Sequence, residues 1–395
     1  MAEDFVFAGE IDDDTNVNSD EVDGSPWWES LSKNQSKILS REDSNKKYSM
    51  KMWNRIRMLE KADIDRINQT AKYEMFYNIN GKNIQELDRK IAESSYNVIR
   101  GNCNTAQSKL GKEMPKISFL TDRANFGLRN AAKMLDQYIE AEFERSELFR
   151  SVCMAVLDAC ISKLGIVKIL FDKKNGRFKA SRVRPLDFLV DDNNSMYTQK
   201  NETFERKKVS TSYLMKMFPN MPQWQKEIIL EEGKGGRVSC FEAFYKDKIR
   251  VWFTSKTILK ITSWEGKPPY FYWRWTQSTM SFWGVGIADE LVTIQRRINY
   301  VMLMIAQSIG LFAIPRVLLN THDNITGSQL TNELGSVIKV STAGEGLAKV
   351  NFLTPPILND QYFQHLEDLY MKAYQITGIS PCLLYTSDAA DERIV

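Results

Sequence analysis

Residues Ser281–Gln307 read SFWGVGIADELVTIQRRINYVMLMIAQ and decide the fold of the second half of the chain. Gly284 and Gly286 lie just before the apolar pattern begins, which is typical of a tight turn leading into a helix. Apolar residues then recur in steps of four and three, so they share one face of a helix that packs against other helices. We predict a helix from Ile287 to about Gly310. Its apolar seam consists of Ile287, Leu291, Ile294, Ile298, Val301 and Ile305.

The same spacing returns further along the chain. It predicts a second helix from Asn359 to Thr377, and a compact β-type unit from Ile314 to about Phe352 separates the two helices. The stripe of the second helix consists of Tyr362, Leu366, Leu369, Ala373 and Ile376.

The first half begins with helical patterns. We predict helix from Lys46 to about Gly101, with a break at 78–81, and again from Arg123 to Leu164. Between them, Gly101 to Asp122 is predicted to be extended, with a short strand at Pro115–Leu120.

A strand-rich region follows. The segments Ile166–Phe171 and Arg177–Val183 flank Asn175-Gly176, and this dipeptide favours a hairpin with a type I′ turn. Short helices are predicted near 210–218 and 223–232. Alternating apolar residues then predict a β-meander from Val238–Tyr245, Ile249–Thr254 and Thr257–Trp264, which Tyr270–Trp275 closes. The sequence therefore predicts an α+β protein.

Length and composition indicate a folded chain of two or three domains, since it has 395 residues, 43% hydrophobic and 26% charged. The charge is uneven. Residues 1–32 contain ten carboxylates and no Lys or Arg, which predicts a disordered acidic leader. The other 363 residues carry a net charge of +13, which is compatible with a polyanionic partner.

Several classes of site are disfavoured. His322 and His365 are the only histidines, which argues against histidine metal sites and against catalytic triads. The five cysteines form no CxxC motif and indicate a reducing compartment. The apolar run Tyr300–Ile314 is shorter than the ~18–20 residues that a membrane span needs. We expect no cofactor, no metal site and no membrane partner.

Two alternatives remain open at this point. Asp187, Asp191 and Asp192 could hold divalent metals in a nuclease or another phosphoryl-transfer enzyme, although acidic residues at strand ends more often form turns. A weaker alternative is a membrane-associated scaffold anchored by Tyr300–Ile314.

Basic residues gather around the predicted hairpin. They could follow a phosphate backbone, or they could form a solvated face. The candidate DNA-phosphate contacts are Lys173, Lys174, Arg177 and Lys179, with Arg182, Arg184 and Arg206-Lys207-Lys208 nearby.

From about Lys61 to Pro381 the order of these parts resembles the portal (head-to-tail connector) proteins of tailed bacteriophages. The most specific stretch is Ser281–Gln307, which is similar to the turn and first stem helix of that family. Two further stretches carry the resemblance: RVRPLDFLVDD at Arg182–Asp192 and AYQITGISP at Ala373–Pro381.

The resemblance implies a non-enzymatic ring of identical subunits, usually twelve, at one capsid vertex. Double-stranded DNA passes through the ring during packaging and ejection. The implied partners are the ATP-driven terminase motor, a tail or adaptor protein, and the major capsid or scaffold protein. The subunit is expected in the virion, and in the host cytoplasm during assembly.

The resemblance also implies a division of the chain. Gly284 and Gly286 form the turn that opens the first stem helix, whose seam is expected to pack between subunits. The implied parts are an acidic leader (1–32), a wing-like α+β domain (33–280), a first stem helix (281–310), a clip-like β unit (311–358) and a second stem helix (359–381).

The last residues depart from the family pattern. Residues 382–395 resemble the translation of a sequencing adapter, so we expect them to be an artefact and the natural protein to continue beyond Pro381.

Overall fold

A computed structural model gives the architecture of the chain. It describes Leu31 and residues 34–79, 96–112, 117–121, 126–172, 175–192, 195, 202–246, 249–313, 316–318, 351–353 and 360–379. Two compact units divide the chain, and each is described by itself. Helices and strands are mixed in both, so the α+β class is confirmed.

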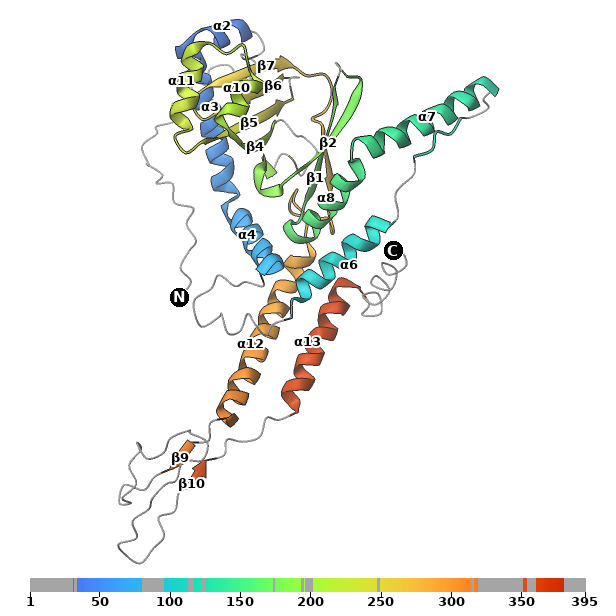
Figure 1. Cartoon of the computed structure of the whole chain (residues 1–395), viewed down its shortest axis with the longest axis vertical. Helices are drawn as coiled ribbons and strands as arrows, with labels where there is room; N and C mark the ends of the chain where they lie inside the picture. The colour runs from blue at the N-terminus through green and yellow to red at the C-terminus, as the bar shows by residue number, and fades with distance from the viewer. Residues whose placement is uncertain are drawn as a thin grey trace, which may run out of the picture. The chain divides into compact units, whose positions relative to one another are not determined.

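The first unit comprises Met1–Lys61 and Asp187–Pro268 and contains a five-stranded antiparallel sheet in the order β3-β4-β5-β6-β7 (Figure 1). The predicted meander forms its β5-β6-β7 part. The strands are β3 (Phe188–Val190), β4 (Glu202–Ser210), β5 (Arg237–Tyr245), β6 (Ile249–Phe253) and β7 (Ile258–Ser263), and the helices are α2 (Gln35–Ser40), α3 (Glu42–Ala62), α10 (Thr211–Met217) and α11 (Gln223–Glu232).

Both faces of this sheet are covered, because apolar side chains of β5 point alternately to one face and to the other. Phe241 and Tyr245 belong to a core that includes Ile56 of α3. Val238 and Cys240 point the other way, into a core with residues of α10 and α11. The fold of this unit therefore follows from a strand pattern of period two.

The second unit comprises Ala62–Leu186 and Pro269–Val395 and contains a three-stranded antiparallel sheet in the order β2-β1-β8. Its helices form one large core. The strands are β1 (Gly165–Asp172), β2 (Arg177–Val183) and β8 (Tyr270–Trp273), with a separate pair β9 (Arg316–Leu318) and β10 (Asn351–Leu353); the helices are α4 (Ile64–Ile79), α6 (Val98–Lys112), α7 (Phe126–Arg145), α8 (Leu148–Ser162), α12 (Ile287–Ala313) and α13 (Gln361–Thr377).

The predicted hairpin is confirmed, but the prediction of a type I′ turn is wrong. Asp172 pairs with Arg177, so the loop has four residues rather than two. Gly176 has a φ of 61°, whereas Asn175 is not among the residues with positive φ. A type I′ turn needs positive φ at both central residues, so this loop is of another type.

Three other predictions are corrected. The stretch predicted to be extended from Gly101 is helical as far as Lys112, and residues 117–121 lie in no strand. Tyr270–Trp273 does not close the meander but pairs with β1. Leu31, which was placed in the leader, is buried in the core of the first unit. The rest of the leader (1–30 and 32), most of the clip-like unit and the tail (382–395) lie outside the described residues.

Candidate functional site: the α12–α13 helix pair

The turn before α12 depends on a glycine at position 284. Gly284 has a φ of 79°, which L side chains rarely adopt. Next to this glycine, the backbones of Thr276 and Val285 form two hydrogen bonds with each other, with N···O distances of 3.1 and 2.9 Å. A Cβ atom at Gly284 would lie 2.8 Å from the carbonyl oxygen of Thr276, so neither the conformation nor the space admits another residue.

Gly286 permits close packing of the turn on α8. A Cβ atom there would lie 2.7 Å from the carbonyl oxygen of Cys160 and 2.9 Å from that of Ala159. The carbonyl of Gly286 accepts the first helical hydrogen bonds of α12, from the N–H groups of Asp289 and Glu290. The turn therefore sets where α12 starts and how closely it approaches the last turn of α8.

Two arginine side chains stack on the aromatic residues of this turn. The guanidinium of Arg66 lies 3.5 Å from the ring centroid of Trp283. Arg274 donates from Nε to the carbonyl oxygen of Phe282 at 2.7 Å, and its guanidinium lies over the Phe282 ring. Contacts of this kind fix both rings, because a cation over an aromatic face is attracted to its negative centre.

A small polar network anchors the first turn of α12. Lys163 pairs with Asp289 at 3.2 Å, and the Tyr73 hydroxyl donates to the same carboxylate. Burial raises the pKa of Tyr73, so the hydroxyl stays protonated and remains a donor. Asp289 also lies where the helix dipole favours a negative charge.

The predicted seam of α12 is buried within its own chain. Ile287 and Ile298 are fully buried, and Ile294 is partly buried against the same core. That core contains residues of α4, α6, α8 and α13. The pattern correctly identified the buried face of α12. Packing of the seam between subunits stays a prediction. The buried members are Ile287, Leu291, Ile298, Val301 and Ile305.

One polar residue, Gln295, interrupts this buried face of α12. Its carboxamide oxygen accepts the N–H of Val98 at 2.8 Å, and its nitrogen donates to the carbonyl of Tyr96 at 2.9 Å. The first N–H groups of a helix lack partners inside the helix, so Gln295 satisfies one at the start of α6. Sequence reasoning missed this residue because a single Gln in a seam carries no positional signal.

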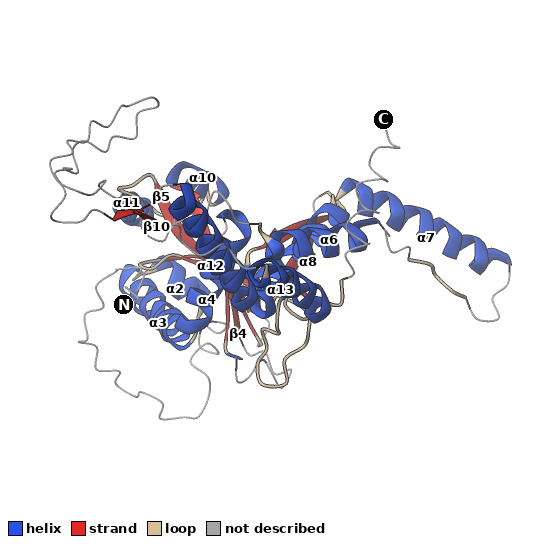
Figure 2. Ribbon diagram, turned by 90° about the horizontal axis from the view of Figure 1, so that it is seen from below, coloured by secondary structure: helices blue, strands red, loops and turns tan. Residues whose placement is uncertain are grey.

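α13 packs beside α12 and against α6 (Figures 1 and 2). Leu369 and Ala373 of the predicted stripe are buried in the common core. Thr377 donates to Asn102 of α6 at 3.1 Å. Gly378, with a φ of 66°, ends the helix in the left-handed conformation that glycine favours.

The β-type unit between the two helices is described only at its base. β9 and β10 are antiparallel, with Leu318 opposite Asn351 and Arg316 opposite Leu353. The chain that leaves along α12 is thereby paired with the chain that returns to α13. His322 lies outside the described residues.

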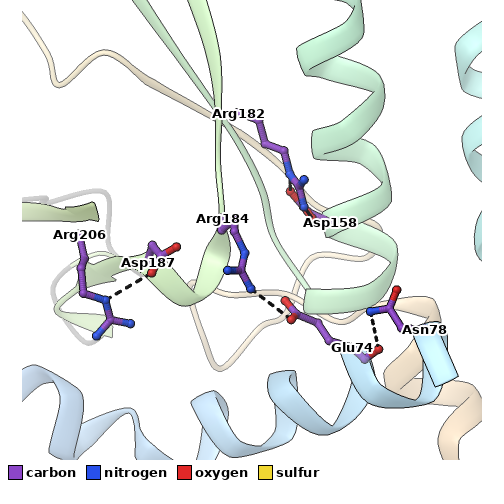
Figure 3. A network of polar contacts seen from close by, with 7 residues as sticks. All are labelled: Glu74, Asn78, Asp158, Arg182, Arg184, Asp187 and Arg206. Atoms are coloured by element: carbon purple, nitrogen blue, oxygen red, sulfur yellow. Dashed lines mark hydrogen bonds and ion pairs between the residues drawn. The ribbon is translucent and has the colours of Figure 1, made fainter. Parts of the chain in front are cut away.

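The basic hairpin is partly neutralised. Figure 3 shows Arg182 pointing from β2 toward Asp158 of α8, with which it makes two hydrogen bonds, and Arg184 pointing toward Glu74 at 3.3 Å. Arg177 and Lys179 are exposed. Lys173 and Lys174 lie outside the described residues.

Two of the three carboxylates of the nuclease alternative, Asp187 and Asp191, are paired with arginines. Asp187 pairs with Arg206 at 3.3 Å (Figure 3), and Asp191 pairs with Arg55 at 3.0 Å. Within the described ranges, no three His, Cys, Asp or Glu side chains are grouped so that they could hold a metal ion. These pairs are the ones expected of structural carboxylates.

The apolar run of the third alternative, Tyr300–Ile314, lies largely in α12. In the described part of the chain, no helix combines the length and the apolar character that a bilayer crossing requires.

Residues 246–382 match the family model described as phage SU10 portal protein. This range begins before β6 and includes α12, the β9–β10 pair and α13. No curated protein matches the chain. The match supports a phage portal protein, and the portal family is a structural one rather than a family of enzymes.

Proposed function

We propose that the chain is a portal subunit that forms a ring of twelve copies at one vertex of a phage capsid. The observation that carries this proposal is the family match over α12, β9–β10 and α13. A helix pair with a small β unit at its far end suits a ring, because the helices can stand side by side around a channel.

In this proposal α12 and α13 are the stem helices, and the unit that contains β9 and β10 is the clip. Residues 33–280 form the wing. The seam of α12 packs inside one chain, so its opposite side is available to a neighbouring stem. Tyr300, 62% exposed, lies on that side.

Contact with DNA would be weak and independent of sequence. A conduit must let the duplex slide, so a few phosphate contacts are preferable to a tight site. Arg177 and Lys179 are exposed and could supply such contacts together with Lys173 and Lys174. Their binding should weaken as salt rises, since phosphate contacts release counterions.

The remaining parts of the proposal follow from the family. The ring docks the terminase motor during packaging and a tail or adaptor protein afterwards, and it contacts the major capsid or scaffold protein. It resides in the virion and assembles in the host cytoplasm.

Mass photometry of the purified full chain tests the proposal. We expect a dominant particle close to twelve times the mass of one chain. A population that stays monomeric or dimeric at every concentration would contradict the ring. Mg²⁺-dependent cleavage of DNA that is lost in Asp187→Asn would instead favour the nuclease.

A further inference from the structure

Helix α7 carries an apolar stripe that its own unit leaves exposed. Of its 20 residues, Ala132 and Glu142 are the buried ones. Leu135 is 48% exposed and Tyr138 is 47% exposed. With Ala131 they are spaced by four and three, which is the spacing of a helix face that packs against a partner.

A neighbouring segment widens this stripe. The N–H of Phe119 donates to Asp136 of α7 at 2.8 Å, so residues 117–121 run beside the helix. Leu120 in this segment is 93% exposed. We define the α7 patch as Ile117, Phe119, Leu120, Leu128, Met134, Leu135 and Tyr138, whose exposed fractions lie between 40% and 93%.

The α7 patch is large enough for a protein interface. If a fully exposed side chain of this size offers about 200 Å², the patch exposes on the order of 800 Å². The largest apolar patch on a typical monomer is about 300–600 Å², and a stable interface takes about 800 Å² from each partner. The area therefore fits a surface that another protein covers.

The three-stranded sheet of the same unit exposes a second apolar surface. Phe171 lies opposite Phe178, Val167 lies opposite Phe271, and Gly165 lies opposite Trp273. Opposed residues share a face, and so do alternate residues along β1. We define the aromatic sheet patch as Phe171, Phe178, Phe271 and Trp273, whose exposed fractions lie between 38% and 60%.

This sheet face is only partly covered by its own chain. Arg182, opposite Val167, lies on it and bonds Asp158, so α8 packs there. The four rings nevertheless expose on the order of 400 Å² in total. A sheet face is normally buried by a layer of helices, so a further helix would complete the layer that α8 begins.

We infer that α7 of one copy packs on the aromatic sheet patch of the next copy around the ring. This inference rests on the proposed function, because a closed ring joins neighbours through two different surfaces of the same chain. The second unit carries both the α7 patch and the aromatic sheet patch. The α7 patch of one copy can therefore pack on the aromatic sheet patch of the next copy. The small, exposed side chain of Ala131 leaves room on the helix for the aromatic rings.

Two double variants of the full chain test this contact. Leu135→Lys with Tyr138→Lys places two charges on the stripe, whereas Asn130→Lys with Gln137→Lys places the same charges at two exposed positions of α7 that are not members of the α7 patch. All four positions are solvent-accessible, so both variants should keep the helical circular dichroism of the wild type. The stripe variant should raise the concentration at which half the chains are in rings by about tenfold or more. The control variant should leave that concentration unchanged.

Cross-linking identifies the partner surface. A photoreactive amino acid at position 135 should join copies through peptides that contain β1, β2 or β8. Wild-type rings that yield no such cross-link, or that yield only links from α7 to α7, would overturn the inference while the ring itself stands. Rings of the stripe variant that form as readily as the wild type would do the same. A wild-type chain that never assembles would overturn the inference together with the proposed function.

Discussion

Gly286→Ala tests the packing that positions α12. The added Cβ would lie 2.7 and 2.9 Å from two backbone oxygens in the last turn of α8. Real Cβ atoms essentially never approach so closely, and backbone cannot move aside as a flexible side chain can. Overpacking of this kind costs about 1–3 kcal/mol. For a unit of this size, that lowers the melting temperature by about 2–12 °C.

Gly101→Ala is the matched control. Gly101 lies inside helix α6 of the same unit, and a Cβ there would meet nothing within 4 Å. Because alanine is the better helix former, this substitution should stabilise by up to about 1 kcal/mol. Differential scanning calorimetry of the wild type and both variants measures the two effects. Equal melting temperatures for Gly286→Ala and the wild type would refute the close approach of α12 to α8.

Two further predictions concern buried residues of the second unit. Burial raises the pKa of Asp158 to about 6, although the hydrogen bonds and the charge of Arg182 oppose this rise. The contribution of this carboxyl to stability is therefore fully present below its ordinary pKa of about 4 and is lost as pH rises through 6, by about 3 kcal/mol. Melting curves from pH 4 to 7 should show this loss in the wild type and not in Asp158→Asn; parallel curves would contradict it. Ile298→Asp places a charge in the core shared by α12 and α13. It should unfold the helical core as well as prevent ring formation, and hydrogen exchange in α12 that matches the wild type would show that the seam is not a core.

Short-range patterns predicted much of the fold. The four-three spacing identified α12 and α13, and alternation identified the meander, because both patterns depend on which side chains must be buried. These patterns do not identify the elements against which the buried side chains pack. Within the chain, the seam Ile287–Ile305 packs against residues of α4, α6, α8 and α13, which the spacing did not identify, and its packing between subunits stays a prediction.

Features set by tertiary contacts escaped sequence reasoning. Tyr270–Trp273 has the alternation of a strand in either sheet, and only the path of the chain selects β1 as its partner. The sequence predicts extended chain from Gly101, yet α6 continues through this glycine to Lys112. The sequence indicates a tight turn at the two glycines, but not that Gly286 approaches Cys160, which is distant in sequence.

The central claim is that this chain assembles into a channelled ring. Negative-stain electron microscopy of the purified full chain tests it most directly. The account predicts end-on views of a ring with a central channel and near-twelvefold symmetry. Discrete monomers or dimers, at concentrations where the chain is folded, would contradict it.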